Sequence, residues 1–335
     1  MMRSCIQYLL GNNAIRLFVL TVVSIVTSCG DKTGVDDPDQ KTSVAPPDSI
    51  SVFYTCDTRG HINPCNCTAG VAGGLARRKT FIAQQQQGDS LIVDAGNNTA
   101  GTRAWELLEL DYILRGYKEI GYDAVNIGAR EAELPVAKLH ELAKTYPFMI
   151  SANVLGADGK PIFSEYKIVT MKSGYRAAVI GVLDDTLLPD EIGEGVKIAP
   201  PEQAIAAVLS KAKTEADFIV LLAFANEQAM KSIADQFYEI DAIIGGDVEQ
   251  PSGEAVTANK STLVYVTDKG KSVGKLDLRH IGGQYVAERN TVTILMENIA
   301  DDTKIAALVN ELRQKQVENN YPTKKDDEDG LTRVN

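Results

Sequence analysis

The segments SVFYTCDTRG, residues 51–60, and SLIVDAGN, residues 90–97, decide how this chain is expected to fold. Each begins as a short run of apolar and β-branched residues and passes directly into a loop that contains glycine. The stretch between them, residues 74–86, has the composition of a helix. Two strands joined through a helix are typical of a parallel βαβ unit, so the chain is predicted to be an α/β protein.

The same alternation continues along the chain and predicts mixed sheets. Further strands are expected at 123–127, 148–154, 166–171, 176–182, 218–224 and 241–245, and helices at 104–120, 135–144, 201–214 and 227–237. The segments 166–171 and 176–182 are separated by four residues that include Gly174, which indicates a hairpin and therefore antiparallel partners. The β-rich runs 263–267, 273–278 and 285–295 precede a last amphipathic helix at 302–318.

Composition excludes several classes of protein. The 335 residues are 44% hydrophobic and 24% charged, which is ordinary for a soluble globular chain and excludes a disordered polymer or a polytopic membrane protein. With 34 basic and 45 acidic residues the net charge is −11, the wrong sign for neutralising phosphates, so no nucleic-acid partner is expected. The chain has only three histidines, which is few for a histidine-rich metal enzyme.

The amino-terminal residues are predicted to direct export and lipid attachment. Residues 1–28 hold two arginines, no acidic residue and the apolar run 17–26, as in a signal peptide. The run ends in Val26-Thr27-Ser28-Cys29, which resembles a bacterial lipobox, so Cys29 is the expected lipidation site. The alternative is an ordinary signal with a chance cysteine. We therefore expect a lipoprotein of the bacterial cell envelope, anchored to a membrane at its periplasmic face or at the cell surface.

The polar residues 29–48 are expected to form a flexible tether, residues 49–320 a folded domain, and the charged residues 321–335 a disordered tail.

The loops after the predicted strands carry an ordered series of motifs. They are Asp57-Thr58-Arg59-Gly60, Gly73-Gly74-Leu75-Ala76-Arg77, Asp94-Ala95-Gly96-Asn97 and Gly128-Ala129-Arg130-Glu131. In this order and spacing, residues 51–318 resemble the metallophosphoesterase domain of the 5′-nucleotidase family, which also contains sulfur-oxidising thiosulfohydrolases. The resemblance implies a four-layer α-β-β-α sandwich with two mixed sheets. The family's second, base-stacking domain is not expected here.

The resemblance also implies which residues form the site. The family uses two metal ions bridged by a carboxylate. Asp57 keeps its ligand position, whereas Arg59, Asn97 and Ala129 stand where the family has a histidine, the bridging aspartate and an asparagine. Arg130 takes the place of the catalytic histidine and is followed by Glu131. The two later family loops correspond to Ala223-Phe224 and to Gly245–Glu249, in which Asp247 and Glu249 are the polar residues.

The substituted residues allow two interpretations. Guanidinium groups cannot ligate a metal, so Arg59 and Arg130 favour loss of the dinuclear centre and supply counter-charges for Asp57, Asp247 and Glu249. Alternatively, Asp57, Asn97, Asp247 and Glu249 hold a single hard cation. A solvated acidic loop at Asp247 and Glu249 also stays open. The expected cofactor is accordingly none or a single metal ion.

Three of the five cysteines gather in the first of these loops. Cys56, Cys65 and Cys67 lie within twelve residues, together with His61. In an oxidising compartment a disulfide is expected, most simply between Cys56 and either Cys65 or Cys67. The alternative is a thiolate-rich metal or redox site formed by the three cysteines and His61. Elsewhere, Arg77 and Arg78 could bind an anion at the start of a helix, but we favour close packing of the preceding loop on that helix. Trp105 is expected in the core.

These observations lead to one functional hypothesis and two alternatives. The first is a lipid-anchored metallophosphoesterase-like pseudoenzyme that has lost the dinuclear centre and binds a ligand, metal or partner through the altered pocket, with a small anion or a protein as the partner. The second is a divergent metal- or thiol-dependent hydrolase acting on phosphoester or sulfur substrates. The third is a thiol redox or metal-handling lipoprotein.

Overall fold

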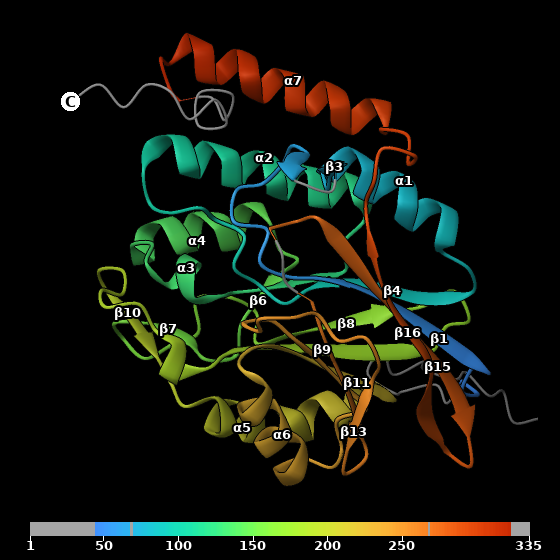
Figure 1. Ribbon diagram of the computed structural model, residues 1–335. Coiled ribbons are helices and arrows are strands. Elements are labelled where there is room, and N and C mark those ends of the chain that lie inside the picture. Colours follow the sequence, from blue (N-terminus) through green and yellow to red (C-terminus); the bar gives the residue numbers. More distant parts are fainter. Residues whose placement is uncertain (1–43, 68–69, 267–268, 323–335) are drawn as a thin grey trace, which may run out of the picture. The chain divides into compact units, whose positions relative to one another are not determined.

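The computed structural model describes residues 44–67, 70–266 and 269–322 (Figure 1). The expected signal peptide, Cys29, tether residues 29–43 and tail residues 323–335 lie outside the described residues. Among the described residues, none of the helices combines the length and the apolar composition needed to cross a bilayer.

The first of two large sheets has six strands. They are β1 (Ser49–Thr55), β4 (Asp89–Asp94), β5 (Ala124–Asn126), β6 (Met149–Ile150), β15 (Ser272–Ile281) and β16 (Gln284–Ile294), in the order β16-β15-β1-β4-β5-β6. Strands β1, β4, β5 and β6 run parallel, while β15 is antiparallel to both β1 and β16. The carboxyl ends of β1, β4 and β5 therefore lie beside one another at one edge.

The second sheet also has six strands. They are β8 (Tyr166–Thr170), β9 (Arg176–Leu183), β11 (Phe218–Phe224), β12 (Ala242–Gly245), β13 (Val256–Ala258) and β14 (Ser261–Tyr265), in the order β13-β14-β12-β11-β9-β8. The four central strands are parallel and the two edge strands are antiparallel to their neighbours. Two small two-stranded antiparallel sheets complete the strands: β2 (Cys65–Cys67) with β3 (Gly70–Ala72), and β7 (Val154–Gly156) with β10 (Val196–Ile198).

Helices cover the outer face of each sheet, as Figure 1 shows. Helices α1 (Leu75–Gln85), α2 (Ala104–Ile120) and α4 (Val136–Thr145) pack on the first sheet, and α5 (Pro201–Glu215) and α6 (Glu227–Gln236) on the second. Helix α7 (Thr303–Glu318) packs on the outer side of α1 and α2 (Figure 1). The short α3 (Ala129–Ala132) and the 3-10 turn η1 (Asp185–Leu187) follow strands β5 and β9.

Three apolar layers hold the sheets and helices together. Along β1, Phe53 packs under the helices while Val52 and Tyr54 face the second sheet, because successive strand side chains point to opposite faces. On β11, Leu222 faces the first sheet and Leu221 faces α5 and α6. The predicted four-layer α-β-β-α sandwich with two mixed sheets is confirmed.

Most predicted elements are present, and the differences have local causes. The run 148–154 is interrupted at residues 151–153, where the Asn153 side chain donates to Leu183 O and Ala199 O at 2.6 and 2.9 Å. Strands β2, β3, β10 and β13 are three residues each, too short for an alternation signal. Trp105 is half-buried rather than in the core, with the Arg103 guanidinium 4.5 Å from its ring.

Residues 44–48, which we assigned to the tether, contact the domain instead. The Asp48 carbonyl accepts a hydrogen bond from His280 N at 2.9 Å, and the Pro47 carbonyl accepts one from Tyr285 OH at 3.0 Å. Val44 packs against the layer between the sheets. The folded domain therefore includes residues 44–48, which precede β1, and so begins several residues earlier than composition alone predicts.

Candidate functional site

The loops after β1 and β4 are joined by backbone hydrogen bonds because the two strands are parallel neighbours. Asp57 N donates to Gly96 O at 2.8 Å, Arg59 N to Asn97 O at 3.1 Å, and Gly60 N to Asn98 O at 2.8 Å. The loop that follows β5 packs against them so closely that a Cβ on Gly128 would lie 2.4 Å from Asn97 N. Three predicted motif loops thus form one compact unit.

The carboxylate of Glu131 holds the loops of this unit together by accepting hydrogen bonds from their backbone. Its Oε2 accepts hydrogen bonds from Asn97 N and Gly128 N, each at 2.9 Å, and its Oε1 accepts from Asn98 N at 2.6 Å and Thr99 N at 2.8 Å. The side chain is fully buried. Burial raises the pKa of Glu131, although the four backbone N–H groups partly offset this. Glu131 therefore shapes the loops and does not face a ligand.

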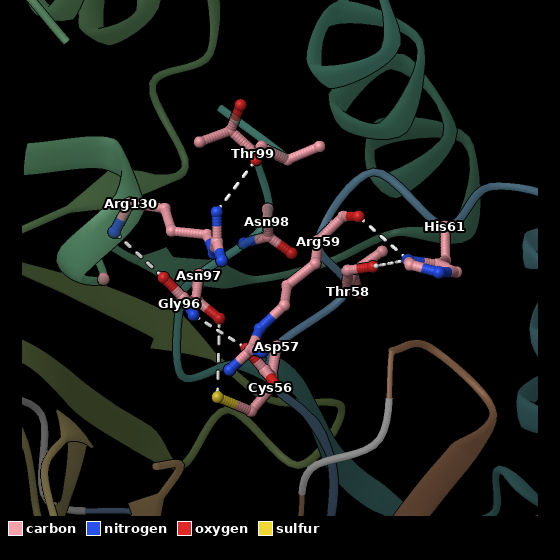
Figure 2. Close-up of polar contacts among 12 residues, drawn as sticks. Cys56, Asp57, Thr58, Arg59, His61, Gly96, Asn97, Asn98, Thr99 and Arg130 are labelled. Atoms are coloured by element: carbon pink, nitrogen blue, oxygen red, sulfur yellow. Dashed lines mark hydrogen bonds and ion pairs between the residues drawn. The ribbon is translucent and has the colours of Figure 1, made fainter. Parts of the chain in front are cut away.

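Two hydrogen-bond donors converge on the carboxylate of Asp57 (Figure 2). Asn97 Nδ2 donates to Asp57 Oδ1 at 2.7 Å, and Arg59 Nε donates to the same oxygen. The other end of the Asn97 amide, Oδ1, accepts from Arg130 N at 2.9 Å, and Arg130 Nη1 donates to Ala100 O at 2.8 Å. The predicted residues Asp57, Arg59, Asn97 and Arg130 are thus brought together.

The backbone of this site adopts conformations that side chains usually avoid. Asp57, Arg59, Asn97 and Asp247 have φ values of 60°, 45°, 68° and 51°, all in the left-handed region. Such conformations persist only where surrounding contacts enforce them, and they concentrate at functional sites. Four of the described non-glycine residues with positive φ lie here, at positions that the resemblance assigns to the site.

A buried polar network supports the loops from the helix side. Arg78, on α1, donates to Tyr117 OH and Tyr122 OH at 3.0 and 3.2 Å and to Thr58 Oγ1 at 3.3 Å. The two tyrosine rings stack with centroids 4.1 Å apart, and Tyr117 OH donates to Asp94 Oδ2 at 3.1 Å. Arg78 is 1% exposed, so the packing interpretation, not an anion site, describes it. Our sequence interpretation missed this network because its members lie on α1, α2, β4 and two loops that are far apart in sequence.

Of the two acidic residues of the β12 loop, Asp247 lies near the site. Burial raises the pKa of Asp247, and the charges of Asp57 and Asp184 add to this while Arg59 opposes it. Asp247 is nevertheless exposed, as is Glu249. The hydrogen bonds given above for Asp57, Arg59, Asn97 and Arg130 do not involve Glu249.

The cysteine cluster is spread over two places. Cys56 is a buried, free thiol that donates to Gly96 O at 3.4 Å, so the expected disulfide from Cys56 to Cys65 or Cys67 is not formed. Burial raises its pKa well above the ordinary value, as do the charges of Asp57, Asp94 and Glu131, which keeps it in the thiol form. Cys65 lies in β2 and is half-buried, and the side chain of Cys67 lies outside the described residues.

His61 turns its ring to the backbone of its own loop. Its Nδ1 lies 2.8 Å from Arg59 O and 3.2 Å from Thr58 O, as the dashed lines in Figure 2 show. Across the described residues, no three His, Cys, Asp or Glu side chains come close enough together to hold a metal ion.

Two mixed six-stranded sheets with outer helices, and a polar site on the loops after β1, β4 and β5, define a protein of the metallophosphoesterase fold. No family model matches the chain. In sequence the chain is 30% identical over 204 residues to a 5′-nucleotidase of Vibrio cholerae, covering 53% of this chain and 36% of that protein. The chain is thus a 5′-nucleotidase-like, phosphoesterase-like protein.

Solved structures agree on the fold. A 5′-nucleotidase precursor from Thermus thermophilus superimposes with a TM-score of 0.68 at 21% identity, covering 81% of this chain and 59% of that one. The calcineurin-like phosphoesterase YfkN from Bacillus subtilis gives 0.63 at 20% identity, covering 82% and 99%. The chain therefore spans well under two thirds of the nucleotidases' length and nearly all of the single phosphoesterase structure.

Proposed function

We propose that this chain is a lipid-anchored protein of the bacterial cell envelope that binds a small anionic ligand through Arg59 and Arg130 and does not hydrolyse phosphoesters. The observation that carries the proposal is the pair of donors on Asp57. The amide of Asn97 and the guanidinium of Arg59 both present N–H groups to a carboxylate oxygen that a metal ion would need.

The donor set does not fit the dinuclear centre of the family. A metal requires lone pairs directed at one point, but Asn97 Nδ2 faces Asp57 and Asn97 Oδ1 is engaged by Arg130 N. A cation at Asp57 would also have to displace the Arg59 guanidinium, which carries the same sign of charge. These contacts support an ion-paired site in place of metals.

The arginines suit an anion because each retains donors. The Arg59 side chain is 33% exposed, and only its Nε is engaged with Asp57 among the described contacts. Arg130 is half-buried and uses Nη1 on the carbonyl of Ala100. Guanidinium groups have five N–H donors in a planar fork that matches carboxylate and phosphate oxygens. Two such groups, on the loops that lie on either side of the β4 loop, can bind one anion from two sides.

The anchor is proposed from the sequence around Cys29. Growth with an alkyne-bearing fatty acid should label the wild-type protein, and Cys29→Ser should abolish the label. Retention of label in that variant would remove lipidation at Cys29 from the proposal.

Catalysis and binding are tested on the same purified protein. Nitrophenyl phosphate, bis-nitrophenyl phosphate and AMP should not turn over with Mn²⁺, Mg²⁺, Zn²⁺ or Ca²⁺. Inorganic phosphate and AMP should bind in a calorimetric titration, and Arg59→Gln or Arg130→Gln should weaken binding at least about tenfold, since each charge-assisted hydrogen bond is worth about 1.5–3 kcal/mol. Arg279→Gln, on β15 beside the amino end of β1 and so at the opposite end of the sheet from Arg59, serves as the matched control.

Turnover that depends on Asp57 and Asp247 would overturn the proposal in favour of a divergent hydrolase. Equal binding by wild type and both arginine variants would show that the anion does not lie at this site.

A further inference from the structure

A cavity lies on the outer side of the second sheet, and its lining does not include Asp57 or Arg130. It opens where β9 and β11 end and where helices α5 and α6 begin, and its volume is about 300 Å³. Val182, Ala225 and Ile233 form its buried apolar wall, and Asp184, Glu202 and Asn226 contribute polar groups. The volume is at the lower end of the range for small-molecule sites.

One carboxylate oxygen at this cavity lacks a hydrogen bond. Asp184 is 4% exposed. Its Oδ1 accepts from Thr186 N at 2.9 Å and from Thr186 Oγ1 at 2.7 Å. Its Oδ2 is buried and accepts no hydrogen bond from any described residue. Buried carboxylate oxygens are normally hydrogen-bonded, so a donor from outside the chain would complete this group.

The charges around the cavity select a cation. Three of the described lining residues are acidic, Asp184, Asp185 and Glu202, and none is basic. The start of α6 is already capped, because Asn226 Oδ1 accepts from Ala229 N at 3.0 Å, so that helix end does not call for an anion. The carboxylates do not converge into a metal-binding group within the described part of the chain. A cation that brings its own N–H donors and some apolar surface fits better than a bare metal ion.

We propose that this cavity binds a small organic amine, whose ammonium group donates to Asp184 Oδ2 while its alkyl part contacts Val182, Ala225 and Ile233. Asp57, Arg59, Asn97 and Arg130 are not among the residues that line this cavity, so the two sites are tested by different variants, although the charge of Asp184 acts on Asp247.

Butylamine and putrescine are the probes, and butanol is the neutral control of the same length. Calorimetric titration of the full chain should show saturable binding of the amines below about 10 mM, a range expected for so small a ligand. Butanol should bind at least about tenfold more weakly, since it lacks the charge. Equal binding of butanol, or no saturation by either amine, would overturn the proposal.

Two variants separate the site from general attraction to an acidic protein. Asp184→Asn keeps the shape and an acceptor for Thr186 and should lower amine affinity at least about tenfold. Asp158→Asn, which removes an exposed aspartate after β7, should leave it unchanged. If Asp184→Asn fails to fold, Ala229→Leu should block the cavity without altering the carboxylate. Unchanged binding in either cavity variant, or stronger binding of Ca²⁺ than of putrescine, would refute an amine site.

Discussion

Replacing Glu131 by glutamine should destabilise the loops of the candidate site. In the wild type, each carboxylate oxygen accepts two backbone N–H groups. A glutamine has one amide oxygen, so its NH₂ group would face either the Asn97 and Gly128 pair or the Asn98 and Thr99 pair. Two buried backbone donors would then lose their acceptor.

The size of the effect follows from burial and charge. Each unsatisfied buried donor costs about 1–3 kcal/mol, so two cost about 2–6 kcal/mol. Removing the buried negative charge offsets part of this, because burial raises the pKa of Glu131 and the ionised form is disfavoured there. We expect a net loss of about 3 kcal/mol in the free energy of unfolding.

Urea denaturation measures the total, and hydrogen exchange locates it. Amide exchange in residues 97–99 should accelerate in Glu131→Gln more than exchange in the core strand β11. Glu133→Gln, two positions further along, is the matched control and should stay within about 0.5 kcal/mol of wild type. A Glu131→Gln variant as stable as that control, with unchanged exchange at residues 97–99, would refute this role of Glu131.

Three further perturbations test other parts of the structure. Burial raises the pKa of Asp241 to about 6, so its stabilising protonated form is lost as pH rises from about 4 through 6. Asp241→Asn should therefore match wild type at pH 4 and exceed it by up to about 3 kcal/mol at pH 7.5 in urea titrations, and a pH-independent difference would contradict this. Gly246→Ala would place a methyl group 2.1 Å from Cys56 Sγ and should cost about 1–3 kcal/mol. Cys56→Ala should recover part of that loss in a double-mutant cycle, and strict additivity would exclude the contact. Arg78→Met should destabilise by about 3–5 kcal/mol because Asp94 loses its buried counter-charge, whereas a loss under about 1 kcal/mol in thermal unfolding would show that the network is unimportant.

The positions of the site loops could be predicted from the sequence, and the contacts between them could not. Strand runs that end in glycine loops place Asp57, Asn97 and Arg130 at neighbouring carboxyl ends, because parallel strands align those ends. The direction of each side chain depends on backbone φ, and the left-handed values at Asp57 and Asn97 are not visible in composition. The sequence therefore located Glu131 at the site without indicating that it binds backbone rather than ligand.

Residues close in sequence are separated where the chain turns. Cys56 and Cys65 are nine positions apart, yet one lies at the end of β1 and the other in the β2–β3 hairpin. Proximity along the chain favoured a disulfide, whereas both thiols are free. The reverse holds for Asp184. The cavity that it lines is completed by the first turns of α5 and α6, which begin far from Asp184 in sequence.

The contacts of residues 44–48 fix where the chain enters the domain. Those residues precede β1, whereas Asp57 and Arg59 follow it, and the seven residues of β1 span about 20 Å. Immobilising the domain through its amino end would thus direct the edge that carries Arg59 and Arg130 toward the bulk solution. The protein can be mounted on a sensor surface in this orientation, and the proposed anion binding tested without redesigning the chain.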